Sequence, residues 1–180
     1  MDLCSIIDKY RNIDVMDGLF QNNIYNLKSM MSNLNITLVE LSLFNYMTSS
    51  IIYGSLDNNK VINNKLNIKD LTSHNVNPNI PILSIEVNSF RDLDNLEILV
   101  KAFCYFSINK LEINLIILNS YISYDKNIEN EIDRIILKYN LKDKINVDNG
   151  IYVILSSLYK SACDIVKNIS NLHIVSGGES

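Results

Sequence analysis

Cysteine and histidine side chains offer this sequence its broadest chemistry, because both types ligate metals and act in catalysis. Cys4, Cys104 and Cys163 lie far apart, are odd in number and include no C-x-x-C pair. His74 and His173 share no helical or turn spacing with each other or with a cysteine. The spacing therefore predicts neither a disulfide framework nor a metal site, and we expect three reduced thiols.

Motifs for nucleotide binding and for an activated serine are missing from the sequence. No G-x-G-x-x-G or G-K-[ST] loop follows an apolar run, and no G-x-S-x-G elbow is present. Acidic residues gather where a helix is expected to begin, and the helix dipole explains them better than acid–base catalysis does. They are Asp125, Glu129, Glu131 and Asp133. We expect no catalytic residue, no metal and no cofactor.

Polar side chains follow the expected strands and form the one candidate binding site. The apolar run "EINLIIL" stops at Asn119, and "PILSIEV" stops at Asn88. In doubly wound sheets, ligands bind outside the carboxyl ends of the strands. The residues predicted to lie there are Asn88, Asn119, Ser120, Ser123 and Tyr124. Ser123 and Asp125 are also candidate caps for the next helix, and capping is the preferred interpretation.

Residues 1–55 show helical periodicity. Thr37 and Glu40 form a T-x-x-E capping box that predicts the start of a second helix. We expect a helical hairpin over 1–55, followed by a polar linker over 56–80 rich in Asn, Asp and Ser. The predicted buried stripe of the second helix is Val39, Leu43, Met47 and Ile51.

Residues 81–180 alternate between strand and helix patterns. The expected strands and the expected helices follow one another with short links, which predicts parallel pairing covered on both faces. The fold class is thus α/β, with a small three-layer unit and a mostly parallel sheet of three or four strands. The strands are expected in 81–87, 112–118, 148–155 and 172–175, and the helices in 92–111, 125–141 and 157–169, the last burying Leu158.

Composition limits the classes of partner. The 180 residues are 47% hydrophobic and 20% charged, with a net charge of -4 and no basic stripe. We therefore expect a folded core and no nucleic-acid partner. No apolar run reaches the roughly 18 residues of a membrane span, and "MDLCSIIDKY" places acids where a signal peptide is basic. The chain is expected to be cytoplasmic, with no direct membrane insertion.

Four collinear segments resemble the cyclic β-1,2-glucan synthases, in their phosphorylase-like region related to the family 94 glycoside phosphorylases. The helical part, from "IIDKYRNIDV" to "MTSSIIY", resembles the segment after the family's β-sandwich. "NIPILSIEV", "LEILVKAFCYFSINKLEINLIILNSYISY" and "NLKDKINVDNGIYVIL" resemble the α/β insert before the catalytic helical barrel. Together the segments cover most of the chain.

The chain departs from the family at polar positions. Cys104 and Ser120 stand where the family has glutamates, Phe106 stands where the family has the aromatic residue that follows the first of these, and residues 74–79 replace a G-I-S-G-D turn. The family's catalytic groups belong to a barrel that is not in this chain, and its membrane-anchored glucosyl-transferring part is also not in it. The resemblance implies a non-catalytic module or fragment acting in glucan metabolism beside β-sandwich and helical-barrel domains. The alternatives are a stand-alone α/β small-molecule-binding protein and a protein-interaction module docking through its helices.

Overall fold

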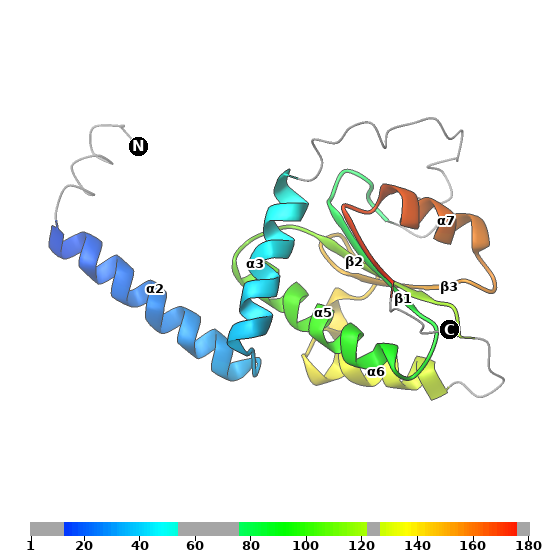
Figure 1. Cartoon of the computed structure of the whole chain (residues 1–180), viewed down its shortest axis with the longest axis horizontal. Helices are drawn as coiled ribbons and strands as arrows, with labels where there is room; N and C mark the ends of the chain where they lie inside the picture. Colours follow the sequence, from blue (N-terminus) through cyan, green and yellow to red (C-terminus); the bar gives the residue numbers. More distant parts are fainter. Residues whose placement is uncertain (1–12, 54–75, 122–126, 176–180) are drawn as a thin grey trace. The chain divides into compact units, whose positions relative to one another are not determined.

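The computed structural model describes residues 13–53, 76–121 and 127–175 (Figure 1). The chain divides into two compact units, Met1–Leu38 and Val39–Ser180. In the first unit the described helix is α2 (Ile13–Asn33). Helix α3 (Leu38–Tyr53) starts directly after Thr37, as its sequence signal predicts, and belongs with the second unit.

The second unit alternates strands and helices along the chain. Its sheet is four-stranded and parallel throughout, in the order β3-β2-β1-β4. This arrangement confirms the predicted α/β fold. The elements are β1 (Ile82–Val87), α5 (Asp92–Ile108), β2 (Asn114–Asn119), α6 (Asn127–Lys138), η3 (Lys142–Lys144), β3 (Ile151–Leu155), α7 (Lys160–Ile169) and β4 (Leu172–Val175).

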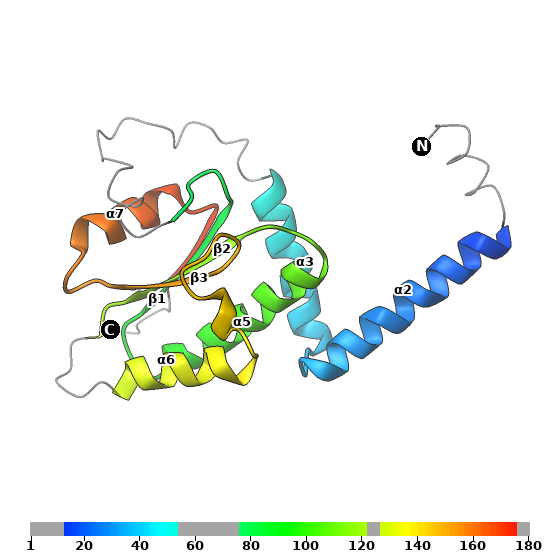
Figure 2. The ribbon, with the colours of Figure 1, turned by 180° about the vertical axis from the view of Figure 1, so that it is seen from behind.

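The sheet lies between two layers of helices. Figures 1 and 2 show α5 and α6 on one face and α7 on the other. Strand side chains alternate between faces, so Leu83 and Ile85 point away from α7 and Ser84 and Glu86 point toward it. On the α7 side, apolar residues of three strands and the helix form one buried cluster together with Val76, which precedes β1; the other members are Ile82, Ile116, Leu118, Tyr152, Ile154, Cys163, Ile165 and Val166.

Helix α3 packs against α5 through aromatic rings. The Phe44 ring is fully buried, with its centroid 5.7 Å from that of Tyr105 and 6.5 Å from that of Phe106. The predicted buried stripe of α3 is therefore only half right. Met47 and Ile51 are buried beside Phe44, but Val39 and Leu43 are 80% and 43% exposed, because the face turned to α5 is centred on Phe44.

Helices α2, α5 and α6 end in a left-handed residue other than glycine. Asn35, Lys110 and Asn140 follow α2, α5 and α6, and each has a positive φ, between 49° and 60°. After α5, the amide of Leu111 donates to the carbonyl of Phe106 at 2.9 Å, which is the long bond of a Schellman motif. The same pattern follows the other two helices. These ends place β2 directly after α5 and η3 directly after α6.

The predicted hairpin of α2 and α3 stays a prediction, and most of the predicted 56–80 linker lies in residues 54–75, outside the described part. Leu158 was expected inside a buried helical face, which is wrong. It precedes α7 and is 68% exposed, because the chain turns between Leu155 and Tyr159 before the helix begins. None of the described helices has the length and apolarity needed to cross a bilayer.

Candidate functional site

The carboxyl ends of the strands meet at one edge of the sheet, as the sequence predicts. In register, Val87 pairs with Asn119, and Asn119 pairs with Leu155. Asn88 and Ser120, the residues that follow β1 and β2, therefore lie at the same edge. The other two predicted site residues, Ser123 and Tyr124, fall in residues 122–126, outside the described part of the chain. Whether any of these residues binds a ligand stays a prediction.

The loop after β1 is closed by the acidic side chain of Asp92, the first residue of α5. Asp92 is 5% exposed. Its carboxylate accepts the backbone amides of Asn88 and Ser89, each at 2.8 Å, and the Ser89 hydroxyl at 3.2 Å. The carboxylate therefore reaches back into the loop, and the Asn88 side chain is left exposed at the edge.

Asn119 has a structural place in the turn after β2. It is 4% exposed, and its side-chain oxygen accepts the amide of Tyr121 at 3.1 Å, which forms an Asx-turn. Its backbone carbonyl accepts the amide of Ser156 at 2.9 Å, extending the pairing of β2 with β3. The turn brings the Tyr121 ring against Phe90, with centroids 5.9 Å apart. Asn119 thus orients an aromatic pair at the edge.

Ser120 belongs to a polar group that we call the edge cluster: Glu86, Ser120, Ser156, Cys163 and Lys167. The Ser120 hydroxyl donates to Glu86 Oε1 at 3.0 Å, and its oxygen lies 2.7 Å from Ser156 Oγ. Glu86 Oε2 is 2.8 Å from Lys167 Nζ. The Cys163 thiol donates to Ser156 Oγ at 3.3 Å. Strands β1, β2 and β3 and helix α7 therefore meet in one chain of hydrogen bonds.

Most members of the edge cluster were missed by sequence reasoning. Glu86 sits in an otherwise apolar strand, and its polar partner two positions earlier is Ser84. That period-two pattern was the available signal, because it marks one face of β1 as polar. Ser156, Cys163 and Lys167 carry no comparable signal. They reach the cluster only through the packing of α7 on the sheet.

The charge states of the edge cluster follow from its contacts. Burial raises the pKa of Glu86, but hydrogen bonds from Lys167 and Ser120 outweigh it, so the pKa lies below its ordinary value. Burial raises the pKa of the Cys163 thiol. At neutral pH the cluster therefore holds a paired carboxylate, an ammonium and a protonated thiol. It has no activated nucleophile, because the Ser120 hydroxyl bonds a carboxylate and no imidazole.

A serine–histidine pair lies beside the edge cluster, but its serine is inaccessible to solvent. Ser84 Oγ lies 2.8 Å from His173 Nδ1 and is fully buried under α7. A substrate cannot reach that hydroxyl. Within residues 13–53, 76–121 and 127–175, no group of three or more His, Cys, Asp or Glu side chains is placed to hold a metal.

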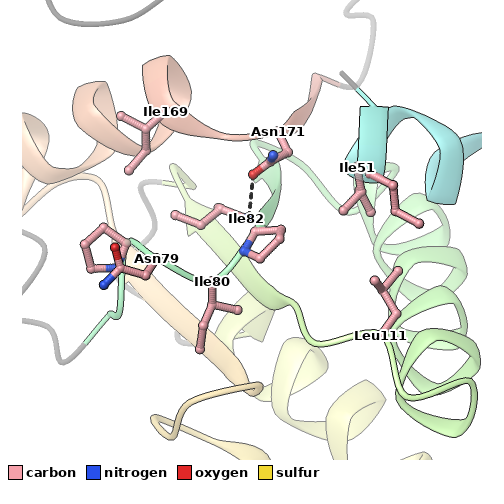
Figure 3. A pocket seen from close by; sticks show the side chains of 10 residues that line it. Ile51, Asn79, Ile80, Ile82, Leu111, Ile169 and Asn171 are labelled. Carbon is pink, nitrogen blue, oxygen red and sulfur yellow. Dashed lines mark hydrogen bonds between the residues drawn. The ribbon is translucent and has the colours of Figure 1, made fainter. Parts of the chain in front are cut away.

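Two hollows of the described surface lie toward the opposite, amino-terminal edge of the sheet. One groove of about 370 Å³ runs between the ends of α3 and α7 and the start of β1 (Figure 3). Ile51, Leu111 and Ile169 line it, and Asn171 accepts the Ile82 amide at 2.9 Å across its floor. A second groove of about 300 Å³ adjoins it between α3 and α5, and both share Ile52 and Leu111.

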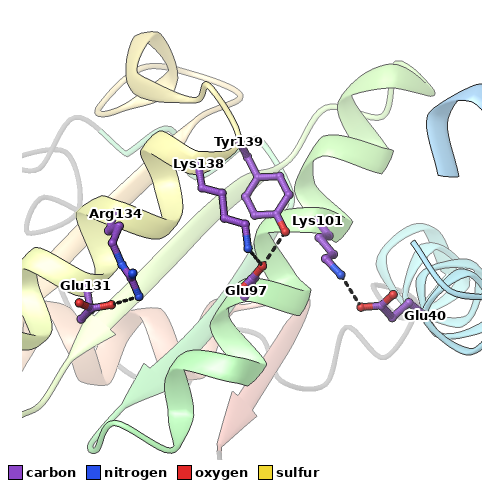
Figure 4. A network of polar contacts seen from close by, with 7 residues as sticks. All are labelled: Glu40, Glu97, Lys101, Glu131, Arg134, Lys138 and Tyr139. Carbon is purple, nitrogen blue, oxygen red and sulfur yellow. Dashed lines mark hydrogen bonds and ion pairs between the residues drawn. The ribbon is translucent and has the colours of Figure 1, made fainter. Parts of the chain in front are cut away.

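A second set of ion pairs ties the helices of the α5 side together (Figure 4). The Glu97 carboxylate accepts from Lys138 Nζ at 2.6 Å and from the Tyr139 hydroxyl at 2.7 Å, which joins α5 to the end of α6. Lys101 Nζ lies 2.9 Å from Glu40 Oε1, which joins α5 to α3. Glu40, Glu97, Lys101 and Lys138 therefore serve as contacts between helices.

Comparison with known proteins adds no assignment to this geometry. No protein-family model matches the chain, and no curated protein is significantly similar to it.

Proposed function

We propose that the chain is a non-catalytic module related to the phosphorylase-like region of the cyclic β-1,2-glucan synthases. In this proposal it acts in glucan metabolism beside β-sandwich and helical-barrel domains that carry the chemistry. The proposal is based on the resemblance of four segments that occur in the same order as in the family. These segments correspond to α2–α3, β1, α5–β2 and η3–β3. The proposal makes the α/β unit a spacer or docking element.

The non-catalytic role is supported by the structural environment of Ser120 and Cys104, which stand at two positions where the family has glutamates. Ser120 uses its hydroxyl inside the edge cluster, on Glu86 and Ser156. Cys104 is 7% exposed in α5, and burial raises its thiol pKa to about 11. Both substituted side chains are therefore absorbed into packing or internal hydrogen bonds. That outcome supports a chain kept for its fold.

The experiment combines the full chain with a second polypeptide that carries the β-sandwich and helical barrel of a cyclic β-1,2-glucan synthase. Sedimentation measures association, and release of glucose 1-phosphate from β-1,2-glucan and phosphate measures activity. We expect association and no product from the chain alone. Product formed by the chain alone and lost in Glu86→Gln would overturn the proposal. Absence of any association would remove the module role.

A second candidate function is the binding of a small apolar ligand, and the two adjoining grooves favour it. The first groove is lined mostly by aliphatic side chains with two asparagines. The second is lined by Ile52, Leu111 and the rings of Tyr105 and Phe106, with polar side chains at its border, so the pair suits an apolar molecule held by few hydrogen bonds. Thermal-shift screening of apolar fragments tests this function. Stabilisation that disappears in Ile169→Asp and persists in Val175→Asp, a matched exposed aliphatic site outside both grooves, would support it. No stabilisation by any fragment would count against it.

A further inference from the structure

A relay of hydrogen bonds links α7 to the edge strand β4. The Ser170 hydroxyl donates to the Val166 carbonyl at 2.6 Å, and its oxygen lies 2.7 Å from Ser84 Oγ. Ser84 Oγ in turn lies 2.8 Å from Nδ1 of His173, the residue that pairs with Ser84 in the β1–β4 register. Both serines are buried. The relay therefore joins β1, β4 and the residue that ends α7.

The heavy atoms assign the protons of this relay. A serine hydroxyl has one proton to donate, and that of Ser170 goes to the Val166 carbonyl. Ser84 must then donate to Ser170, because otherwise two acceptor oxygens would face each other at 2.7 Å. With its proton used, Ser84 accepts from His173. The neutral imidazole of His173 thus carries its proton on Nδ1, and Nε2 carries the lone pair.

The second nitrogen of His173 has a poor environment for a proton. Nε2 is buried, and no residue in the described part of the chain bonds it. Two charged groups act on the ring from the elements packed around it, Lys167 of α7 and Glu86 of β1. Burial lowers the pKa of His173, Lys167 lowers it further, and Glu86 offsets only part of this. Glu86 already accepts from Lys167 and Ser120.

We propose that His173 is an acid-sensitive latch, which holds β4 on the sheet in its neutral Nδ1–H form and releases the strand when Nε2 takes up a proton. The added positive charge on the imidazole would be buried beside the Lys167 ammonium. The nearby carboxylate of Glu86 could not compensate it fully, because it already accepts from Lys167 and Ser120. Strand β4 is the element that gives way, because among the described strands it lies at the end of the sheet order and pairs with β1 alone. Once β4 opens, the imidazole is solvated and the proton is accommodated.

The first test is made by NMR on the full chain, with His74→Asn to isolate the imidazole signals of His173. We expect the neutral ring to carry its proton on Nδ1 and to titrate below about pH 6.5, the ordinary histidine value. As the pH is lowered from about 7.5 to about 5.5, hydrogen exchange of the backbone amides of Leu172–Val175 should become faster, after correction for intrinsic exchange. A proton on Nε2, or titration at or above the ordinary value, overturns the latch.

Two variants separate the latch from general acid instability. His173→Asn keeps a nitrogen donor near the Nδ1 position and cannot titrate, so its β4 exchange should not respond to acid in this window. Lys167→Gln should raise the His173 pKa and shrink the acid response, while Lys160→Gln, at the exposed start of α7, should leave it unchanged. An undiminished acid response in His173→Asn overturns the proposal, as does equal acceleration of β2 amides in the parent chain.

Discussion

Lys167 of α7 and Glu86 of β1 form a partly buried ion pair, with Nζ 2.8 Å from Oε2 and the two side chains 34% and 16% exposed. The pair links the last helix to the centre of the sheet, across a large separation in sequence. Glu86 also receives the Ser120 hydroxyl, so its carboxylate has a donor on each oxygen. The ionised state of Glu86 therefore depends on β2 and α7 at once.

Lys167→Met should destabilise the chain by about 1–2 kcal/mol, because it leaves a half-buried carboxylate with one donor while the lysine is only partly shielded from water. Urea denaturation followed by circular dichroism measures the change. Lys160→Met is the matched control on the same helix, where the side chain is exposed. Equal stability of the two variants would show that the ion pair is not a tertiary contact in solution.

Acid should weaken the fold through Glu86 and Glu97. Hydrogen bonds from Lys138 and Tyr139 lower the pKa of Glu97, and those from Lys167 and Ser120 lower the pKa of Glu86. Both pKa values lie below 4.5, the ordinary value for a glutamate. A lowered carboxyl pKa contributes stability above the unfolded value, and this is lost as pH falls through the folded value. The free energy of unfolding should thus drop below about pH 4.5. The double variant Glu86→Gln, Glu97→Gln should show a shallower drop, and an unchanged slope would contradict the assignment.

Phe44→Ala should cost about 3–5 kcal/mol, because it removes a fully buried ring from the contact of α3 with α5. Thermal denaturation measures the loss. Tyr46→Ala provides the control on the same helix, since that ring is 69% exposed and should cost little. If both substitutions were neutral, α3 would not be part of the folded α/β unit.

Lys110→Gly should stabilise the chain by about 0.5–1 kcal/mol, because Lys110 has a φ of 60° that glycine adopts without strain. Ser107→Gly, one turn earlier inside α5, should instead destabilise by about 0.5 kcal/mol through lost helix propensity. The two variants change the same helix end in opposite directions, which chemical denaturation resolves. If both variants were destabilised, the contacts of the Lys110 side chain would contribute more free energy than its positive φ costs.

Sequence by itself determined the class of the fold and the order of its elements. The apolar runs of β1 and β2 are buried as predicted, and the 3.6-residue spacing of Leu96, Leu99 and Phe103 marks the buried face of α5. Both features are local, because periodicity reports only which side of an element is apolar. The same local pattern marks where β1 and β2 end, at Asn88 and at Asn119–Ser120, and parallel pairing then brings these residues to one edge.

Tertiary structure alone decided what those residues contact. The order β3-β2-β1-β4 puts β1 between β2 and β4. Glu86 of β1 therefore contacts Ser120 at the end of β2, and Ser84 of β1 contacts His173 of β4. Lys167 completes this arrangement from a helix late in the chain. No sequence spacing encodes such pairs, because contacts between distant segments depend on the strand order and helix placement that form only when the whole unit folds.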